Sequence, residues 1–148
     1  MVNIINSIRL KDIRKDNDIK QEEMAEYINI KRDAYSKYET GVALPNIEVV
    51  FNFSKYFGLS IDYVLGLTNK RIKTNYEKFD KKLIANNLKQ LRLNKGLSQS
   101  GLARKLNITQ SAIHRYENLL SNPSLNIIYK YCKLFNITFD EICSKKVK

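Results

Sequence analysis

The sequence is poor in the residues from which metal sites, disulfide frameworks and catalytic centres are built. Its 148 residues include two cysteines and one histidine, and Cys132 and Cys143 are not spaced as a CxxC pair. A structural zinc site needs several soft ligands, and a disulfide scaffold needs more cysteine pairs. No serine–histidine–aspartate set, phosphate-cradling glycine loop or pair of carboxylates in a cleft is recognisable. We therefore expect a protein that is not an enzyme and that has no metal or cofactor.

Glycine, proline and long apolar runs are also scarce. Five glycines and two prolines exclude a loop-rich or collagen-like chain, while 43% apolar residues exclude a wholly disordered one. No window approaches the roughly 18 apolar residues of a membrane span, and the first residues lack the basic and apolar regions of a secretion signal. The sequence predicts a cytoplasmic protein with no membrane contact.

Acidic residues are few in one half of the chain. The whole sequence has 26 basic and 15 acidic residues, for a formal net charge of +11. Residues 1–67 carry nine basic and ten acidic side chains, whereas residues 83–148 carry eleven and three. Such a basic half favours a polyanionic partner such as nucleic acid. A solvated, lysine-rich surface is the alternative that charge alone leaves open.

The chain contains an internal repeat. A shift of 78 positions aligns residues 10–64 with residues 88–142 without a gap. A register kept over some fifty residues is not a chance event, and it indicates two copies of one small module. We predict domains at 1–67 and 83–148, joined by a basic linker at 68–82. Identical pairs include Leu10/Leu88, Arg14/Arg92, Gln21/Gln99, Ala25/Ala103, Asn29/Asn107, Tyr38/Tyr116, Glu39/Glu117, Pro45/Pro123 and Asp62/Asp140.

Apolar spacing predicts five short helices in each copy and an all-α fold. In the second copy Ile84, Leu88 and Leu91 stand at i, i+4 and i+7, as on one face of a helix. No segment shows the sustained alternation of a strand. Further helices are expected at about 99–106, 110–118 and 125–135, with a short fifth one beginning at Thr138 or Asp140.

Capping residues mark where these helices start and stop. Ser98 and Thr109 each stand one residue before a predicted helix, where a hydroxyl can accept a hydrogen bond from a free backbone amide. Gly96 suits the end of the first helix, and Asn107 suits a left-handed turn better than most residues.

The second and third predicted helices of each copy have the pattern of a helix-turn-helix. They are short, a turn of a few residues joins them, and a small alanine stands where the helices would cross closely. In the second copy the outward face of the third helix offers Gln110, Ser111, His114 and Arg115, with no acidic residue until Glu117. A face that meets only water would more usually mix glutamate and lysine. An ordinary helical hairpin is the alternative reading.

The two copies resemble the phage-repressor-type (Xre/Cro-like) helix-turn-helix family. The resemblance is carried by LRLNKGLSQSGLARKLNITQSAIHRYEN in the second copy, by DIRKDNDIKQEEMAEYINIKRDAYSKYETG in the first, and by SIDYVLG as its closing helix. It implies two tandem five-helix domains of the lambda-repressor type. It further implies a transcription regulator, in particular a repressor, that binds double-stranded DNA with the third helix in the major groove.

The resemblance also implies which residues would touch DNA. The phosphate-binding glutamine at the start of the second helix falls on Gln21 and Gln99. Positions at the end of the third helix that commonly touch the backbone fall on Thr40 and Asn118. The base-reading positions fall on Lys31, Arg32, Asp33, Ser36 and Lys37 in the first copy and on Thr109, Gln110, Ser111, His114 and Arg115 in the second.

Two further pairs match a structural feature of that family. Arg14 with Glu39, and Arg92 with Glu117, correspond to the ion pair that ties the first helix to the third. We expect each pair to be a partly buried salt bridge that positions the recognition helix without touching DNA.

The first copy departs from the family pattern. Lys20 and Lys31 replace the hydroxyl caps of its second and third helices, and Glu22, Glu23 and Glu26 make its second helix acidic. The second copy lacks the glycine that the first has at position 41. We expect the second copy to supply most of the DNA affinity. The first copy then either reads a weaker half-site or serves association.

Several modes of assembly remain open from the sequence. A fully extended linker of fifteen residues reaches about 50 Å, more than the roughly 34 Å between successive major-groove faces. One chain could therefore bind unlike half-sites, and a homodimer could bind a longer palindrome. The main alternative function is an antitoxin-like or adaptor module whose first domain binds a protein partner. RNA binding is disfavoured because no exposed aromatic platform is evident.

Overall fold

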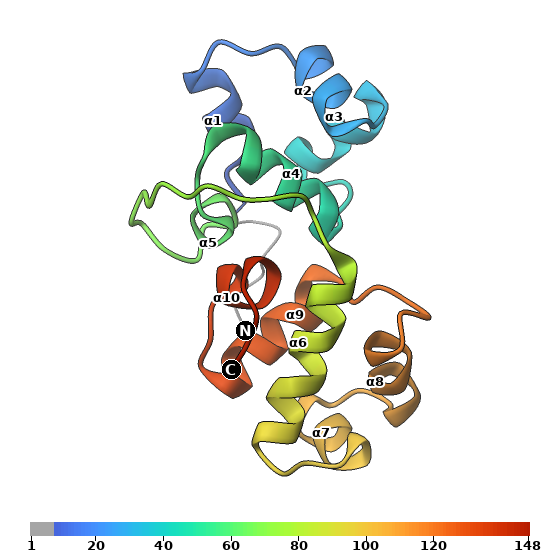
Figure 1. The fold of residues 1–148 in the computed structure, drawn as a ribbon. Helices are drawn as coiled ribbons and strands as arrows, with labels where there is room; N and C mark the ends of the chain where they lie inside the picture. The colour runs from blue at the N-terminus through green and yellow to red at the C-terminus, as the bar shows by residue number, and fades with distance from the viewer. Residues whose placement is uncertain (1–7) are drawn as a thin grey trace. The chain divides into compact units, whose positions relative to one another are not determined.

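The computed structural model describes residues 8–148, which form ten α-helices in two compact units divided after Glu77. Five helices belong to each unit, and Figure 1 shows the two sets coloured from blue to green and from yellow-green to red. The described part of the chain contains no strand beyond an isolated bridge between Leu59 and Lys73. The all-α prediction with two five-helix copies is confirmed. None of the helices in this part of the chain is long and apolar enough to cross a membrane.

Corresponding helices follow one another in the same order in both units. The first unit contains α1 (Leu10–Asp16), α2 (Gln21–Ile28), α3 (Arg32–Thr40), α4 (Ile47–Phe57) and α5 (Ile61–Val64). The second unit contains α6 (Lys81–Asn94), α7 (Gln99–Leu106), α8 (Gln110–Glu117), α9 (Leu125–Phe135) and α10 (Phe139–Ser144).

The core of each unit is made by the apolar positions that the repeat pairs. Leu10 and Leu88 are 1% and 0% exposed, and Met24 and Leu102 are 1% and 0% exposed. Each such side chain contributes about 1.5–3 kcal/mol by leaving water. Because the same positions are buried twice, the repeat in the sequence is a repeat of the packing.

The helix starts follow the capping residues. The hydroxyls of Ser98 and Thr109 accept hydrogen bonds from the amides three residues further on, at 2.9 and 3.1 Å. In the first unit Lys20 and Lys31 occupy the same positions with extended backbone and make no side-chain cap. The caps predicted for the second copy, and their loss in the first, are confirmed.

The segment that follows α5 packs on the first unit. The Ile72 carbonyl accepts a hydrogen bond from the Ser60 amide at 3.1 Å, and the Thr74 amide donates to the Gly58 carbonyl at 2.8 Å. These bonds place residues 72–74 alongside the turn between α4 and α5.

Tyr76 anchors the end of that segment. Its hydroxyl accepts a hydrogen bond from the Ile61 amide at 3.0 Å, its ring lies 5.1 Å from that of Phe51, and the residue is 7% exposed. The next helix begins at Lys81, with the Asp80 carboxylate accepting from the first amides. A buried aromatic side chain therefore holds residues 72–76 of the predicted linker on the first unit.

In each unit one side chain near the start of the repeated module hydrogen-bonds to the backbone at the end of the unit. Arg9 donates to the carbonyls of Tyr63 and Thr68 at 2.9 and 2.8 Å. The equivalent residue of the second unit, Asn87, donates to the carbonyls of Ile142 and Lys145 at 2.7 and 2.6 Å. Different side chains thus tie the start of each module to its end.

Candidate nucleic-acid interface

Each unit presents a helix-turn-helix made of its second and third helices. The connecting turns begin at Asn29 and Asn107, whose φ angles of 63° and 55° are left-handed and end α2 and α7 sharply. Ala25 and Ala103 are 2% and 3% exposed where the following helix crosses. A larger side chain at either alanine would separate the two helices, which explains the small residue in both copies.

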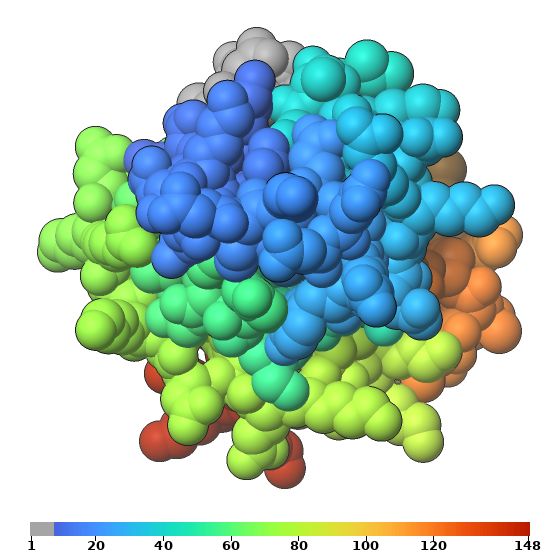
Figure 2. Space-filling view, turned by 90° about the horizontal axis from the view of Figure 1, so that it is seen from above, coloured from blue at the N-terminus to red at the C-terminus, as the bar shows by residue number. Residues whose placement is uncertain are grey.

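The residues predicted to touch DNA lie on the outer surface of these helices. Gln21, Gln99 and Ser36 are half-buried, and the others are exposed. Figure 2 views the first unit from a side on which atoms of α1, α2 and α3, blue to cyan, form the surface. The exposed members of the set are Lys31, Arg32, Asp33, Lys37, Thr40, Thr109, Gln110, Ser111, His114, Arg115 and Asn118.

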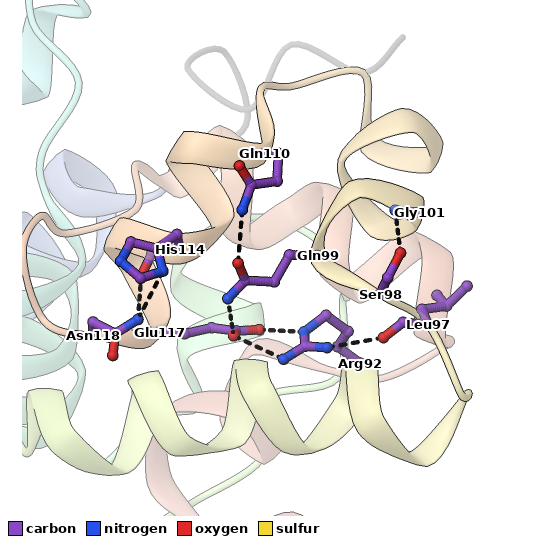
Figure 3. Close-up of polar contacts among 9 residues, drawn as sticks. All are labelled: Arg92, Leu97, Ser98, Gln99, Gly101, Gln110, His114, Glu117 and Asn118. Atoms are coloured by element: carbon purple, nitrogen blue, oxygen red, sulfur yellow. Dashed lines mark hydrogen bonds and ion pairs between the residues drawn. The ribbon is translucent and has the colours of Figure 1, made fainter.

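The recognition helix of the second unit is held by a buried ion pair. The Arg92 guanidinium donates to both carboxylate oxygens of Glu117, at 2.6 and 3.0 Å, and to the Leu97 carbonyl at 2.9 Å (Figure 3). The two side chains are 10% and 1% exposed. The predicted salt bridge between the first and third helices is confirmed, and it fixes α8 against α6.

A chain of hydrogen bonds runs from this ion pair to the surface of the recognition helix (Figure 3). Gln99 donates through Nε2 to Glu117 at 3.0 Å, and its Oε1 accepts from Gln110 Nε2 at 2.8 Å. An ionised carboxylate can only accept, so Glu117 decides which end of the Gln99 amide points outward. Gln110 is consequently held with its Oε1 and one N–H left for another molecule.

The first unit repeats the inner part of this network. Arg14 Nε donates to Glu39 Oε1 at 2.5 Å, and Gln21 Nε2 donates to Glu39 Oε2 at 2.9 Å. Arg32 stands where the second unit has Gln110, and its side chain is exposed. The outward chemistry of the two units therefore differs although their inner support is the same.

Burial and hydrogen bonding act in opposite directions on the Glu39 carboxyl. Burial disfavours its charge, but hydrogen bonds from Arg14 and Gln21 outweigh burial and lower its pKa below the ordinary value. The pKa of the Arg14 guanidinium is raised, mainly by its hydrogen bond to Glu39. Both groups of this pair therefore stay charged near neutral pH.

The sequence did not predict the side-chain contacts at the surface of α8. The Asn118 side-chain amide donates to the His114 carbonyl at 2.8 Å and lies 3.3 Å from His114 Nδ1 (Figure 3). The bond between Gln99 and Gln110 was also missed. The sequence does show a glutamine at the start of each of these helices. Whether the two glutamines meet depends on how closely α7 and α8 cross.

The cysteines lie apart from this surface. Cys132 and Cys143 are both buried, and no disulfide joins them in the described part of the chain. Within residues 8–148 no group of three or more histidine, cysteine, aspartate or glutamate side chains could hold a metal ion.

Comparison with known proteins places this arrangement in a family. A family model described as helix-turn-helix matches residues 10–64 and, a second time, residues 88–142. The two matches together cover more than half of the chain. The chain therefore belongs to this helix-turn-helix family and contains two tandem copies of its domain.

Several curated proteins resemble single stretches of the chain. YqaE of Bacillus subtilis, an uncharacterized HTH-type transcriptional regulator, is 36% identical over 67 residues, which are 45% of this chain and 58% of that protein. The cryptic phage CTXphi transcriptional repressor RstR of Vibrio cholerae is 34% identical over 55 residues, 37% of this chain and 50% of that protein. The transcriptional activator BcrR of Enterococcus faecalis is 37% identical over 57 residues, 38% of this chain and 28% of that protein.

The matched stretches thus span about half the length of these relatives or less. No solved structure matches the chain significantly.

Proposed function

We propose that the protein binds a specific double-stranded DNA site through α3 and α8 and regulates transcription, as a repressor. The observation that carries this proposal is the exposed polar row Gln110, Ser111, His114 and Arg115 on a helix whose position is fixed by a buried ion pair. The helix-turn-helix family and the relatives named as transcriptional regulators support it. One of these relatives is named a transcriptional repressor, and another is named a transcriptional activator.

The chemistry of α8 suits the edges of bases in a major groove. Arginine can donate two hydrogen bonds to guanine, and glutamine can pair with adenine through its amide oxygen and one N–H. Gln110 keeps that pair of groups while its other N–H is bonded to Gln99. We expect Gln110 and Arg115 to contact bases.

A phosphate would bind at the start of α7. The first backbone amides of this helix, apart from the Gly101 amide that Ser98 caps, have no partner within the helix, and the helix dipole adds attraction for an anion. The equivalent place in the first unit is the start of α2 at Gln21.

We further propose that the second unit supplies most of the DNA affinity. Residues 78–148 carry fourteen basic and four acidic side chains, whereas residues 1–77 carry twelve and eleven. The recognition helix α3 also exposes Asp33 where α8 has Ser111. A carboxylate close to phosphates opposes binding, so the first unit would read a weaker half-site.

The test is selection of bound sequences from a random DNA pool, followed by titration of the selected duplex against a scrambled one. Specific affinity should fall by about 0.9 log unit per log unit of salt for each phosphate contacted. Two unlike half-sites would indicate one chain per site, and a longer palindrome would indicate a homodimer.

A pair of variants tests the assignment of the recognition helix. The double variant Gln110→Ala/Arg115→Ala should lose selectivity and about 2–5 kcal/mol of binding free energy. The control Lys133→Ala removes one charge from the exposed surface of α9 and should change affinity far less. Unchanged binding by the double variant would show that α8 does not read DNA.

A second candidate concerns the first unit alone. Its nearly balanced charge and the exposed acidic residues Glu22, Glu23 and Glu26 of α2 favour a protein partner over a polyanion. Capture of one stoichiometric protein by the full chain, together with DNA binding no stronger than nonspecific, would favour this function.

A further inference from the structure

The first unit contains a groove of about 530 Å³ between the C-terminal end of α2 and the side of α4. Tyr27, Ile28 and Asn29 line it from α2 and the following turn, and Glu48, Asn52 and Lys55 line it from α4. None of the residues predicted to touch DNA lines this groove. It is therefore a feature separate from the recognition surface.

In the second unit a lysine of the chain occupies the equivalent place. The Lys130 ammonium donates a hydrogen bond to the Leu106 carbonyl at 3.0 Å, at the C-terminal end of α7. The last carbonyls of a helix carry partial negative charge and attract cations. The repeat pairs Lys130 with Asn52 and Leu106 with Ile28. The left-handed Asn29 and Asn107 give the two turns the same shape.

Three differences between the units make the groove of the first unit less positive than the equivalent site of the second. Asn52 replaces Lys130, Tyr27 replaces Lys105, and Glu48 replaces Asn126. The first unit thereby loses two ammonium groups and gains a carboxylate and an aromatic ring. Lys55 has a lysine at the equivalent position of the second unit, so that cation is common to both.

The groove offers an ammonium group a backbone carbonyl and the face of an aromatic ring. Within residues 8–148, no hydrogen bond reaches the Ile28 carbonyl, which corresponds to the one that Lys130 caps. Tyr27 is 49% exposed and stands edge-to-face with Tyr56, with ring centroids 4.4 Å apart. The face of a tyrosine ring attracts a cation electrostatically.

We propose that this groove binds a primary alkylammonium group, supplied by a lysine side chain of a partner protein or by a free polyamine. Such a group has three donors. The Ile28 carbonyl, the Asn52 amide oxygen and the Glu48 carboxylate are the acceptors for them, and Tyr27 covers the alkyl stem. The first unit thus takes from another molecule the cation that the second unit supplies from its own chain.

The test is a titration of the full chain, labelled with ¹⁵N, followed by NMR. One arm adds spermidine and the other adds the peptide acetyl-Gly-Lys-Gly-amide, with the norleucine peptide as the uncharged control. We expect saturable shifts at Asn29, Ile30 and the Asn52 side-chain amide. Shifts with the peptide alone indicate a partner protein, shifts with spermidine alone indicate a polyamine, and both results support an ammonium site.

Variants at the groove decide whether the shifts report this site. Asn52→Lys introduces the lysine of the second unit and should abolish them, while Glu48→Gln should raise the dissociation constant about two- to fivefold. Glu22→Gln removes the same charge elsewhere on the unit and should leave binding unchanged. Absence of saturable shifts in both arms, or binding unaltered by both groove variants, would overturn the proposal.

Discussion

Glu117 accepts hydrogen bonds from three donor atoms on two side chains, which makes it the residue on which the candidate site depends. Arg92 uses two of its nitrogen atoms, and Gln99 uses its amide nitrogen. The carboxylate is 1% exposed, so water cannot replace a lost partner. Its charge both fixes α8 and selects the orientation of the Gln99 amide.

Replacing Glu117 by glutamine should therefore affect stability and binding together. The NH₂ group of the new amide would face the N–H donors of Arg92 or Gln99, and the Arg92 charge would be left unpaired. We expect a loss of about 3 kcal/mol in the free energy of unfolding, because the site is buried. Urea unfolding of the full chain, followed by helical circular dichroism, measures the loss. The control Glu77→Gln alters an exposed carboxylate and should change stability by less than about 0.5 kcal/mol. Equal stability of the two variants would contradict the role given to the ion pair.

The equivalent carboxylate of the first unit predicts a dependence on pH. The pKa of Glu39 is lower in the folded protein than its ordinary value of 4.5. The stabilisation is therefore complete above pH 4.5 and is lost as the pH falls through the folded pKa. Thermal unfolding in a series of buffers from neutral to acid measures this loss.

The Glu39→Gln variant should lack the part of the acid destabilisation that comes from protonation of Glu39. The exposed Glu26→Gln should keep it. An acid profile unaltered by Glu39→Gln would show that other carboxylates govern the transition.

At the scale of the elements, a residue just past each recognition helix has a left-handed backbone, which is strained in one unit and not in the other. Gly41 ends α3 with a φ of 79°, and Leu119, its counterpart after α8, has a φ of 60°. A left-handed backbone is unfavourable for a residue with a Cβ atom. Leu119 is 41% exposed, so packing compensates little for this strain.

Leu119→Gly should consequently stabilise the second unit. Glycine relieves the backbone strain, but its greater freedom in the unfolded chain offsets part of this gain. The free energy of unfolding should rise by about 0.5–1 kcal/mol. Leu120→Gly is the matched control, because Leu120 is exposed and lacks a positive φ, and it should be neutral or destabilising. Denaturant midpoints of the two variants give the comparison. A lower midpoint for Leu119→Gly would mean that the leucine side chain stabilises the turn by packing.

At the scale of the whole molecule, the two units differ in charge far more than in fold. Both have the same five helices and the same buried ion pair, yet the excess of positive charge belongs to residues 78–148. We infer that the duplication has kept the support of the recognition helix and changed its outward face.

This asymmetry predicts unequal effects of equivalent mutations. Lys37→Ala and Arg115→Ala remove one positive charge from the same position of α3 and α8. Arg115→Ala should weaken specific DNA binding by about 1–3 kcal/mol and relax one base position. Lys37→Ala should cost less, because α3 carries Asp33 and its unit is nearly neutral. Fluorescence anisotropy with the selected duplex measures both, and a larger loss for Lys37→Ala would reverse the assignment of the two units.

The amino-acid sequence by itself determined the repeat, the helices and the caps of the second copy. These features depend on spacing along the chain: apolar residues recur with the helical period, and Ser98 or Thr109 bonds an amide three residues away. The pairing of Arg92 with Glu117 was visible because the family resemblance supplied it. That the residues named from this resemblance contact DNA stays a prediction.

Only the tertiary structure decided three other features. Gln99 bonds Gln110, and Tyr76 fixes residues 72–76 to the first unit. Asn52 lines a groove, whereas its counterpart Lys130 bonds the Leu106 carbonyl. Each depends on side chains from different elements meeting after the helices have packed, and no local period records such a meeting. Tyr76 in particular has no counterpart in the repeat, so comparison of the two copies could not reveal that residues 72–76 pack on the first unit.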